Sequence, residues 1–209
     1  MKNLSLGIIL ILVFTLGCED TSNIVNPVVN TNIESSYKVT DFDYELIPLP
    51  PKSALWSDSI LTVSQTIDGS VGGRIIMDKY YIAASGDSVI LEADLIIEPG
   101  SFQGIETITM TIDDEFAAIH FFPEMYFQDT LKLTQRFKGL DLANFEKGKL
   151  DFVFIHEDGT IELIQREGLK INKKKGSVKV NNARLLHFSR YGWIRSPEGP
   201  IPYPTPVAE

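Results

Sequence analysis

The chain has 209 residues, of which 44% are apolar, 22% are charged and 10% are aromatic. This length suits one domain or two small ones, and the apolar fraction excludes a wholly disordered chain. With 28 acidic and 19 basic side chains, the net charge of -9 argues against binding nucleic acid or anionic membranes through bulk electrostatics. The single Cys excludes intrachain disulfides and cysteine-rich zinc sites.

The N-terminal segment has the pattern of an export signal. Lys2 gives a short cationic start, and residues 6–16 are then almost continuously apolar. Crossing the hydrocarbon layer of a bilayer takes about 20 residues, so this segment is too short to span it. It does have the length of the apolar region of a signal peptide, which we assign to residues 1–17.

Cys18, the only Cys of the chain, ends this apolar segment. The segment Thr15-Leu16-Gly17-Cys18 resembles the lipobox of bacterial lipoproteins, although Thr15 stands where that motif usually has Leu. The resemblance implies cleavage before Cys18, lipidation of its thiol, and a location in the cell envelope on the periplasmic or cell-surface side. An ordinary secretory signal with a coincidental Cys is the alternative. Loss of residues 1–17 leaves 18 basic and 28 acidic side chains, a net charge of -10.

The rest of the chain divides into a tether, a domain and a tail. Residues 18–36 carry the lipidation site and a stretch rich in Asn, Thr and Ser without periodicity, which predicts a flexible tether. Residues 196–209 contain five prolines, which exclude both a helix and a central strand, so an extended C-terminal tail is expected. The folded domain is therefore predicted at residues 37–195.

Within residues 37–195, apolar and polar side chains alternate with period two, as in half-buried strands. Gly-rich and Asp-rich breaks recur about every ten residues, among them Pro99-Gly100 and a hairpin signal at residues 156–159. Only residues 139–148 could form a short helical turn. The sequence predicts an all-β fold, an antiparallel β-sandwich of eight to ten short strands. The apolar positions that carry this prediction are Val89, Leu91, Ala93, Leu95, Ile97, Ile108, Met110, Ile112, Leu131, Leu133, Leu150, Phe152 and Phe154.

One stretch of the domain resembles the ZU5 family. Gly72-Gly73 opens a strand, an apolar strand follows at residues 89–97, and the turn Glu98-Pro99-Gly100-Ser101 comes next. This order is similar to the ZU5 domain, although Ser101 stands where that family often has Ala. The resemblance extends over residues 70–191. It implies a β-sandwich module that mediates protein contacts, not an enzyme acting on an outside substrate.

Some ZU5-like domains cleave themselves at a His-Phe-Ser tripeptide, and this chain has His187-Phe188-Ser189. Self-processing before Ser189 is therefore an alternative function. The reaction needs His187 to act as a general base for the Ser189 hydroxyl, at a strained bend of the chain. The apolar flanks at residues 185–186 and 191–193 predict one continuous strand instead. We therefore expect the tripeptide to be structural.

Two other segments are candidate binding surfaces. The aromatic segment 121–127 contains Phe121, Phe122, Tyr126 and Phe127 around Pro123, and an exposed loop of this kind could bind sugar rings or a partner protein. A carbohydrate-binding module is thus a further alternative. Residues 170–179 contain five Lys, which could face an acidic partner or lipid headgroups; a solvated hairpin tip is the simpler interpretation.

The remaining motifs give no reason to expect an enzyme. Neither His120 nor His156 lies in a tight metal-ligand motif, and the acidic pairs at residues 113–115 and 157–158 lack the spacing of a calcium loop. Gly-rich phosphate loops and Gly-x-Ser-x-Gly elbows do not occur. We expect no metal, no cofactor and no catalysis on outside substrates. The expected partners are the membrane, through the lipid anchor, and a protein of the cell envelope.

Overall fold

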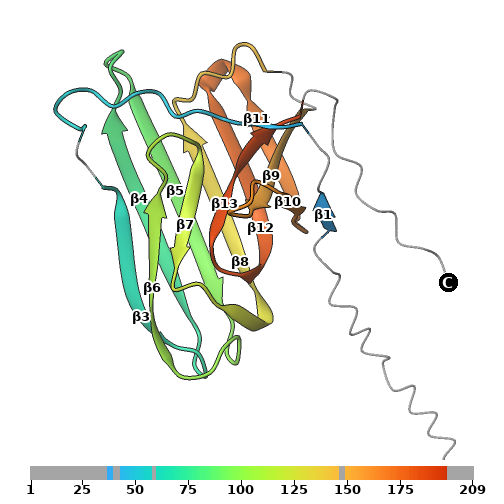
Figure 1. Ribbon diagram of the computed structural model, residues 1–209. Helices are drawn as coiled ribbons and strands as arrows, with labels where there is room; N and C mark the ends of the chain where they lie inside the picture. The colour runs from blue at the N-terminus through green and yellow to red at the C-terminus, as the bar shows by residue number, and fades with distance from the viewer. Residues whose placement is uncertain (1–36, 40–42, 58–59, 146–148, 197–209) are drawn as a thin grey trace, which may run out of the picture. The chain divides into compact units, whose positions relative to one another are not determined.

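The computed structural model is an all-β protein in which two antiparallel sheets pack face to face (Figure 1). It describes residues 37–39, 43–57, 60–145 and 149–196. The predicted β-sandwich is confirmed. The predicted signal peptide, lipidation site, tether and Pro-rich tail lie outside the described residues, except for Ser196.

The described residues form thirteen strands, more than the eight to ten predicted. The additional strands are short: β1 and β10 have three residues each and β2 has two, which is too few for alternation to be visible in the sequence. The strands are β1 (Tyr37–Val39), β2 (Glu45–Leu46), β3 (Thr62–Asp68), β4 (Gly73–Ile82), β5 (Ser88–Ile97), β6 (Ile105–Ile112), β7 (Ala118–Phe122), β8 (Tyr126–Lys138), β9 (Leu150–Ile155), β10 (Ile161–Leu163), β11 (Gly168–Asn172), β12 (Ser177–His187) and β13 (Arg190–Arg195).

The smaller sheet has the strand order β11-β12-β8-β5-β4. Its strands alternate as the sequence predicts: on β5, Val89, Leu91, Ala93, Leu95 and Ile97 are all buried, while the residues between them are partly exposed. Every second side chain of β5 and β8 is buried, and these side chains form one side of the core. The other face of the sheet carries charged side chains.

The larger sheet has the order β1-β10-β9-β13-β7-β6-β3, with β2 also paired to β13. Its inward side chains include Phe152, Tyr191 and Trp193, which are completely or almost completely buried. A second, smaller apolar cluster covers the other side of β9 and β10, where Val153, Ile155, Ile161, Leu163 and Ile194 pack together.

Two short connections close the sandwich at opposite edges. Residues 69–72 join β3 to β4, so the outermost strands of the two sheets meet at one edge. Residues 164–167 join β10 to β11 at the opposite edge. The chain therefore enters the sandwich, through β1, at the edge that also carries β11 (Figure 1).

The two predicted turns are confirmed. At Pro99-Gly100, the Ser101 N–H donates to the Glu98 carbonyl at 3.2 Å, and Gly100 has a φ of 87°. At residues 156–159, the Gly159 N–H donates to the His156 carbonyl at 3.1 Å, and Gly159 has a φ of 79°. Both glycines occupy the left-handed region that such turns require.

Two local features differ from what the sequence predicts. Residues 139–145 of the segment expected to hold a helical turn form turns and irregular backbone, and residues 146–148 lie outside the described part of the chain. A 3₁₀ turn that the sequence did not predict lies at Lys173–Lys175. Residues 185–193 are not one strand, because β12 ends at His187 and β13 begins at Arg190 in the other sheet.

Candidate functional site

The His187-Phe188-Ser189 tripeptide connects the two sheets. Its backbone stays hydrogen-bonded at this crossing, because the Phe188 N–H donates to the Met125 carbonyl at 2.9 Å and the Ser189 carbonyl accepts from the Phe121 N–H at 2.7 Å. Phe188 is buried and stacks on Phe121 with ring centroids 5.0 Å apart. The tripeptide is thus at a bend, but this bend is firmly held on both sides.

The side chains of the tripeptide point to different carboxylates. His187 Nε2 lies 3.6 Å from Glu162 Oε2, and the Ser189 hydroxyl donates to Glu124 Oε1 at 3.3 Å. The contacts of the imidazole and of the hydroxyl therefore do not form the His-to-Ser hydrogen bond that general-base attack requires. His187 and Ser189 are near each other in the sequence, but their side chains do not form a catalytic pair.

Glu162 links two histidines that are far apart in the sequence. Its Oε1 lies 2.7 Å from His156 Nε2, and its other oxygen faces His187. The ring of Phe154 packs perpendicular to both imidazoles, with its centroid 4.6 Å from that of His156 and 4.1 Å from that of His187. Since the Glu162 side chain is only 11% exposed, the hydrogen bond with His156 supplies a partner that a buried carboxylate needs, and His187 lies beyond hydrogen-bond distance.

A second carboxylate, Asp113, is held by a different set of partners. His120 Nε2 lies 3.0 Å from its Oδ2, and Arg190 Nη2 lies 2.7 Å from the same oxygen. Burial alone would raise the pKa of Asp113, but hydrogen bonds from His120 and from the backbone N–H groups of Glu115 and Phe116, together with the Arg190 charge, lower it to about 2. Through its ion pair with Arg190, Asp113 connects the turn between β6 and β7 to β13.

Neither histidine cluster has the arrangement of a metal centre. Within the ranges that the structure describes, no group of three or more His, Cys, Asp or Glu side chains could hold a metal ion. A membrane-crossing helix is likewise not found among these residues.

The aromatic segment 121–127 divides into buried and exposed rings. Phe121 is completely buried, and Phe127 packs edge-on against Phe188 with centroids 4.6 Å apart. Phe122 and Tyr126 are 49% and 84% exposed. Of the four aromatic residues proposed as a ligand platform, two therefore pack in or against the core, and two are accessible to a ligand.

The five lysines of residues 170–179 lie on one hairpin, formed by β11 and β12. Lys170 and Lys179 are register partners, and their sequence neighbours Leu169, Ile171, Val178 and Val180 pack into the core. Lys173, Lys174 and Lys175 form the 3₁₀ turn at the tip. Among the described residues, none of these five ammonium groups has a carboxylate within ion-pair distance, whereas Lys132 and Lys138 on the neighbouring β8 pair with Glu98 and Glu92. We refer to residues 168–179 as the lysine hairpin.

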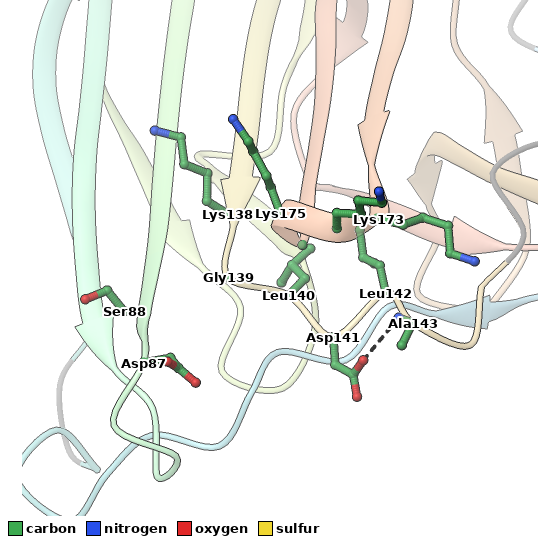
Figure 2. A pocket seen from close by; sticks show the side chains of 12 residues that line it. Asp87, Ser88, Lys138, Gly139, Leu140, Asp141, Leu142, Ala143, Lys173 and Lys175 are labelled. Carbon is green, nitrogen blue, oxygen red and sulfur yellow. Dashed lines mark hydrogen bonds between the residues drawn. The ribbon is translucent and has the colours of Figure 1, made fainter.

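The tip of the lysine hairpin borders a pocket of about 540 Å³. Figure 2 shows it between the β4–β5 turn, with Asp87 and Ser88, and the tip, with Lys173 and Lys175. Lys138 and residues 139–143 line the side between them. The close packing here needs glycine, because a Cβ on Gly176 would lie 2.1 Å from the Leu140 carbonyl oxygen.

Sequence reasoning missed how the charges are sorted. The register places Lys170, Lys179, Arg136, Glu92 and Asp78 side by side across the outer face of the smaller sheet, from β11 to β4. Along this row the basic side chains lie on β11, β12 and β8 and the acidic side chains on β5 and β4, where Arg74 is paired with Asp94. The five lysines were visible in the sequence, but the strand order that sets them apart from the carboxylates was not.

Comparisons with models of protein families, with curated proteins and with solved structures found no match to this chain. The fold and the lysine hairpin therefore define the class of the protein: it is a β-sandwich protein with a basic hairpin at one edge.

Proposed function

We propose that this chain is a binding or structural module of the cell envelope, held at a membrane by lipid on Cys18 and making contacts with a partner protein. The observation that carries the proposal is the position of the only Cys, directly after an apolar segment of signal-peptide length. The first strand within the described residues begins at Tyr37, so 18 residues separate Cys18 from it. This order of signal, lipidated Cys, spacer and domain suits a protein displayed at a membrane surface.

The assignment to a ZU5-like module belongs to the same proposal. Its support is the Glu98-Pro99-Gly100-Ser101 turn, which follows directly on β5, together with the His187-Phe188-Ser189 tripeptide near the end of the domain. A ZU5-like module would act through surface contacts and not through catalysis on an outside substrate.

Metabolic labelling with a fatty acid analogue tests the anchor. We expect label on the wild-type protein and none on Cys18→Ala, which should also be released from the membrane or keep residues 1–17. The matched control is Ser22→Ala, a similarly small change four residues away that leaves the motif intact. Equal membrane association of both variants with no label on either would refute the proposal.

A carbohydrate-binding module is the second candidate, favoured by the exposure of Phe122 and Tyr126. Aromatic rings that are open to solvent can stack on sugar rings. If this function is correct, binding on a glycan array is lost in Phe122→Ala and in Tyr126→Ala. The control is Tyr80→Ala, because Tyr80 is 54% exposed on β4, far from this segment in the fold. Binding that is insensitive to Phe122 and Tyr126, or no binding to any glycan, rules out this role for the segment.

A further inference from the structure

The lysine hairpin concentrates positive charge in an acidic protein. Five of the 19 basic side chains of the chain lie on it, and Arg184 adds a further cation on β12, while Lys132 and Arg136 on β8 are paired with Glu98 and Glu92. The hairpin lysines have no ion pair within the described part of the chain, so Asp87 and Asp141, which line the pocket at the tip, offset their mutual repulsion only in part. An anionic partner would relieve this repulsion.

The net charge of the protein does not prevent such a partner from binding. Interactions between exposed charges are largely screened beyond about 8 Å at physiological ionic strength. Carboxylates such as Asp78 and Asp94 lie on β4 and β5, at the other side of the sheet from β11. An anionic surface in contact with the lysine hairpin is therefore influenced mainly by the local lysines.

The hairpin lies at the edge of the sandwich where the described chain begins. β11 is the outermost strand of its sheet, and β1, where the described chain begins, is the outermost strand of the other sheet at the same edge (Figure 1). The 18 residues between Cys18 and Tyr37 can span at most about 60 Å. A spacer of this length allows the edge that carries β1 and the lysines to come into contact with the membrane that holds the anchor.

We propose that the lysine hairpin docks on anionic phospholipid headgroups of the membrane that holds the anchor. This inference rests on the proposed function, since it takes the lipid on Cys18 as the first attachment. Lysine ammonium groups are compact, strongly hydrated charges, which suits contact with headgroups without insertion into the bilayer. The second attachment would orient the domain, with the β3–β4 edge directed away from the membrane.

Sedimentation with lipid vesicles tests the docking without the anchor. The protein is the chain from residue 18 onward with Cys18→Ser, which carries no lipid and retains all thirteen strands. Vesicles of phosphatidylcholine are compared with vesicles in which about a third of the lipid is phosphatidylglycerol. We expect at least tenfold tighter binding to the anionic vesicles, declining as salt is raised.

Matched charge variants show whether the hairpin is responsible. Each lysine at an anionic surface contributes about a fivefold effect, so Lys173→Gln with Lys174→Gln should weaken binding at least tenfold. The control, Arg74→Gln with Lys79→Gln on β4, makes the same change in net charge at the opposite edge and should alter binding less than about twofold. Unchanged far-ultraviolet spectra establish that both pairs are folded.

Three results would overturn the docking proposal: no preference for anionic vesicles, equal loss in both pairs of variants, or binding to soluble polyglutamate without binding to vesicles. The last result would identify an acidic polymer as the partner. Because the tested protein has no lipid, the docking and the anchor can fail separately. Vesicle binding by a protein that is never labelled at Cys18 would refute the anchor alone.

Discussion

Gln135 is a polar side chain in an apolar layer of the sandwich. It points inward from β8 between Leu133 and Phe137, it is completely buried, and neither its oxygen nor its nitrogen has a hydrogen-bond partner among the described residues. A buried amide without partners costs about 1–3 kcal/mol of stability.

Replacement of Gln135 by Met should therefore stabilise the protein, because Met has a similar length and no polar group to desolvate. We expect a gain of about 1 kcal/mol, or a rise in Tm of about 2–4 °C, in thermal unfolding followed by circular dichroism. A lower Tm would contradict this prediction, and would mean that a buried water satisfies the amide.

Gly100 lies in the turn that follows β5, and its substitution tests whether this turn requires a positive φ. Its φ is 87°, and no atom lies within 4 Å of the position that a Cβ would occupy. Substitution therefore causes backbone strain without a steric clash. Gly100→Val should cost about 1 kcal/mol or more and lower Tm by several degrees, whereas Gly100→Asn, which tolerates positive φ better, should lower it less. Equal Tm values for Val and Gly would show that the turn does not constrain this residue.

Asp113 gives the stability a dependence on pH. Its pKa is about 2 in the folded protein, below the ordinary aspartate value of 3.8 that applies to the unfolded chain, so the ionised form is favoured by folding. The stabilisation is complete above the unfolded pKa and is lost as pH falls from about 4 to about 2. After allowance for solvent screening it amounts to about 1–2 kcal/mol.

The corresponding variant is Asp113→Asn, which has no charge to lose. We expect the Tm of the wild type to fall toward that of Asp113→Asn between pH 4 and pH 2, when the two proteins are compared in the same buffers. A constant difference between them across this range would exclude the ionised Asp113 as the source of the stabilisation.

At the scale of elements, the alternation of side chains was sufficient to predict the sandwich but not its strand boundaries. Residues 185–193 keep an apolar pattern through Phe188, because both β12 and β13 bury side chains in the same core. The pattern reports burial and does not report which sheet a strand belongs to. This is why the change of sheet at Phe188-Ser189 was predicted as a continuous strand.

The contacts of the tripeptide lead us to expect an intact chain. Ser189 donates to Glu124, and His187 faces Glu162, so the imidazole is not directed at the hydroxyl. Mass spectrometry of the purified protein should find a single chain through residues 188 and 189. A 21-residue fragment that begins at Ser189, and that is absent in Ser189→Ala, would show that the domain cleaves itself.

At the scale of the whole molecule, the candidate surfaces depended on information that the sequence does not contain. The composition of the lysine hairpin and of the aromatic segment could be read directly. The separation of the exposed Phe122 and Tyr126 from the buried Phe121 and the partly buried Phe127 depends on how the chain leaves β7. The isolation of the hairpin lysines depends on the order of five strands. Long-range pairing of this kind is decided by the global fold and not by local pattern.

The central claim is that the mature protein begins with a lipid-modified Cys18. The most direct measurement is mass spectrometry of the N-terminal peptide from protein extracted from the membrane fraction. Our account predicts a peptide that starts at Cys18, lacks residues 1–17 and carries the mass of two or three acyl chains. A mature N-terminus at another residue, or a Cys18 with an unmodified thiol, would contradict it.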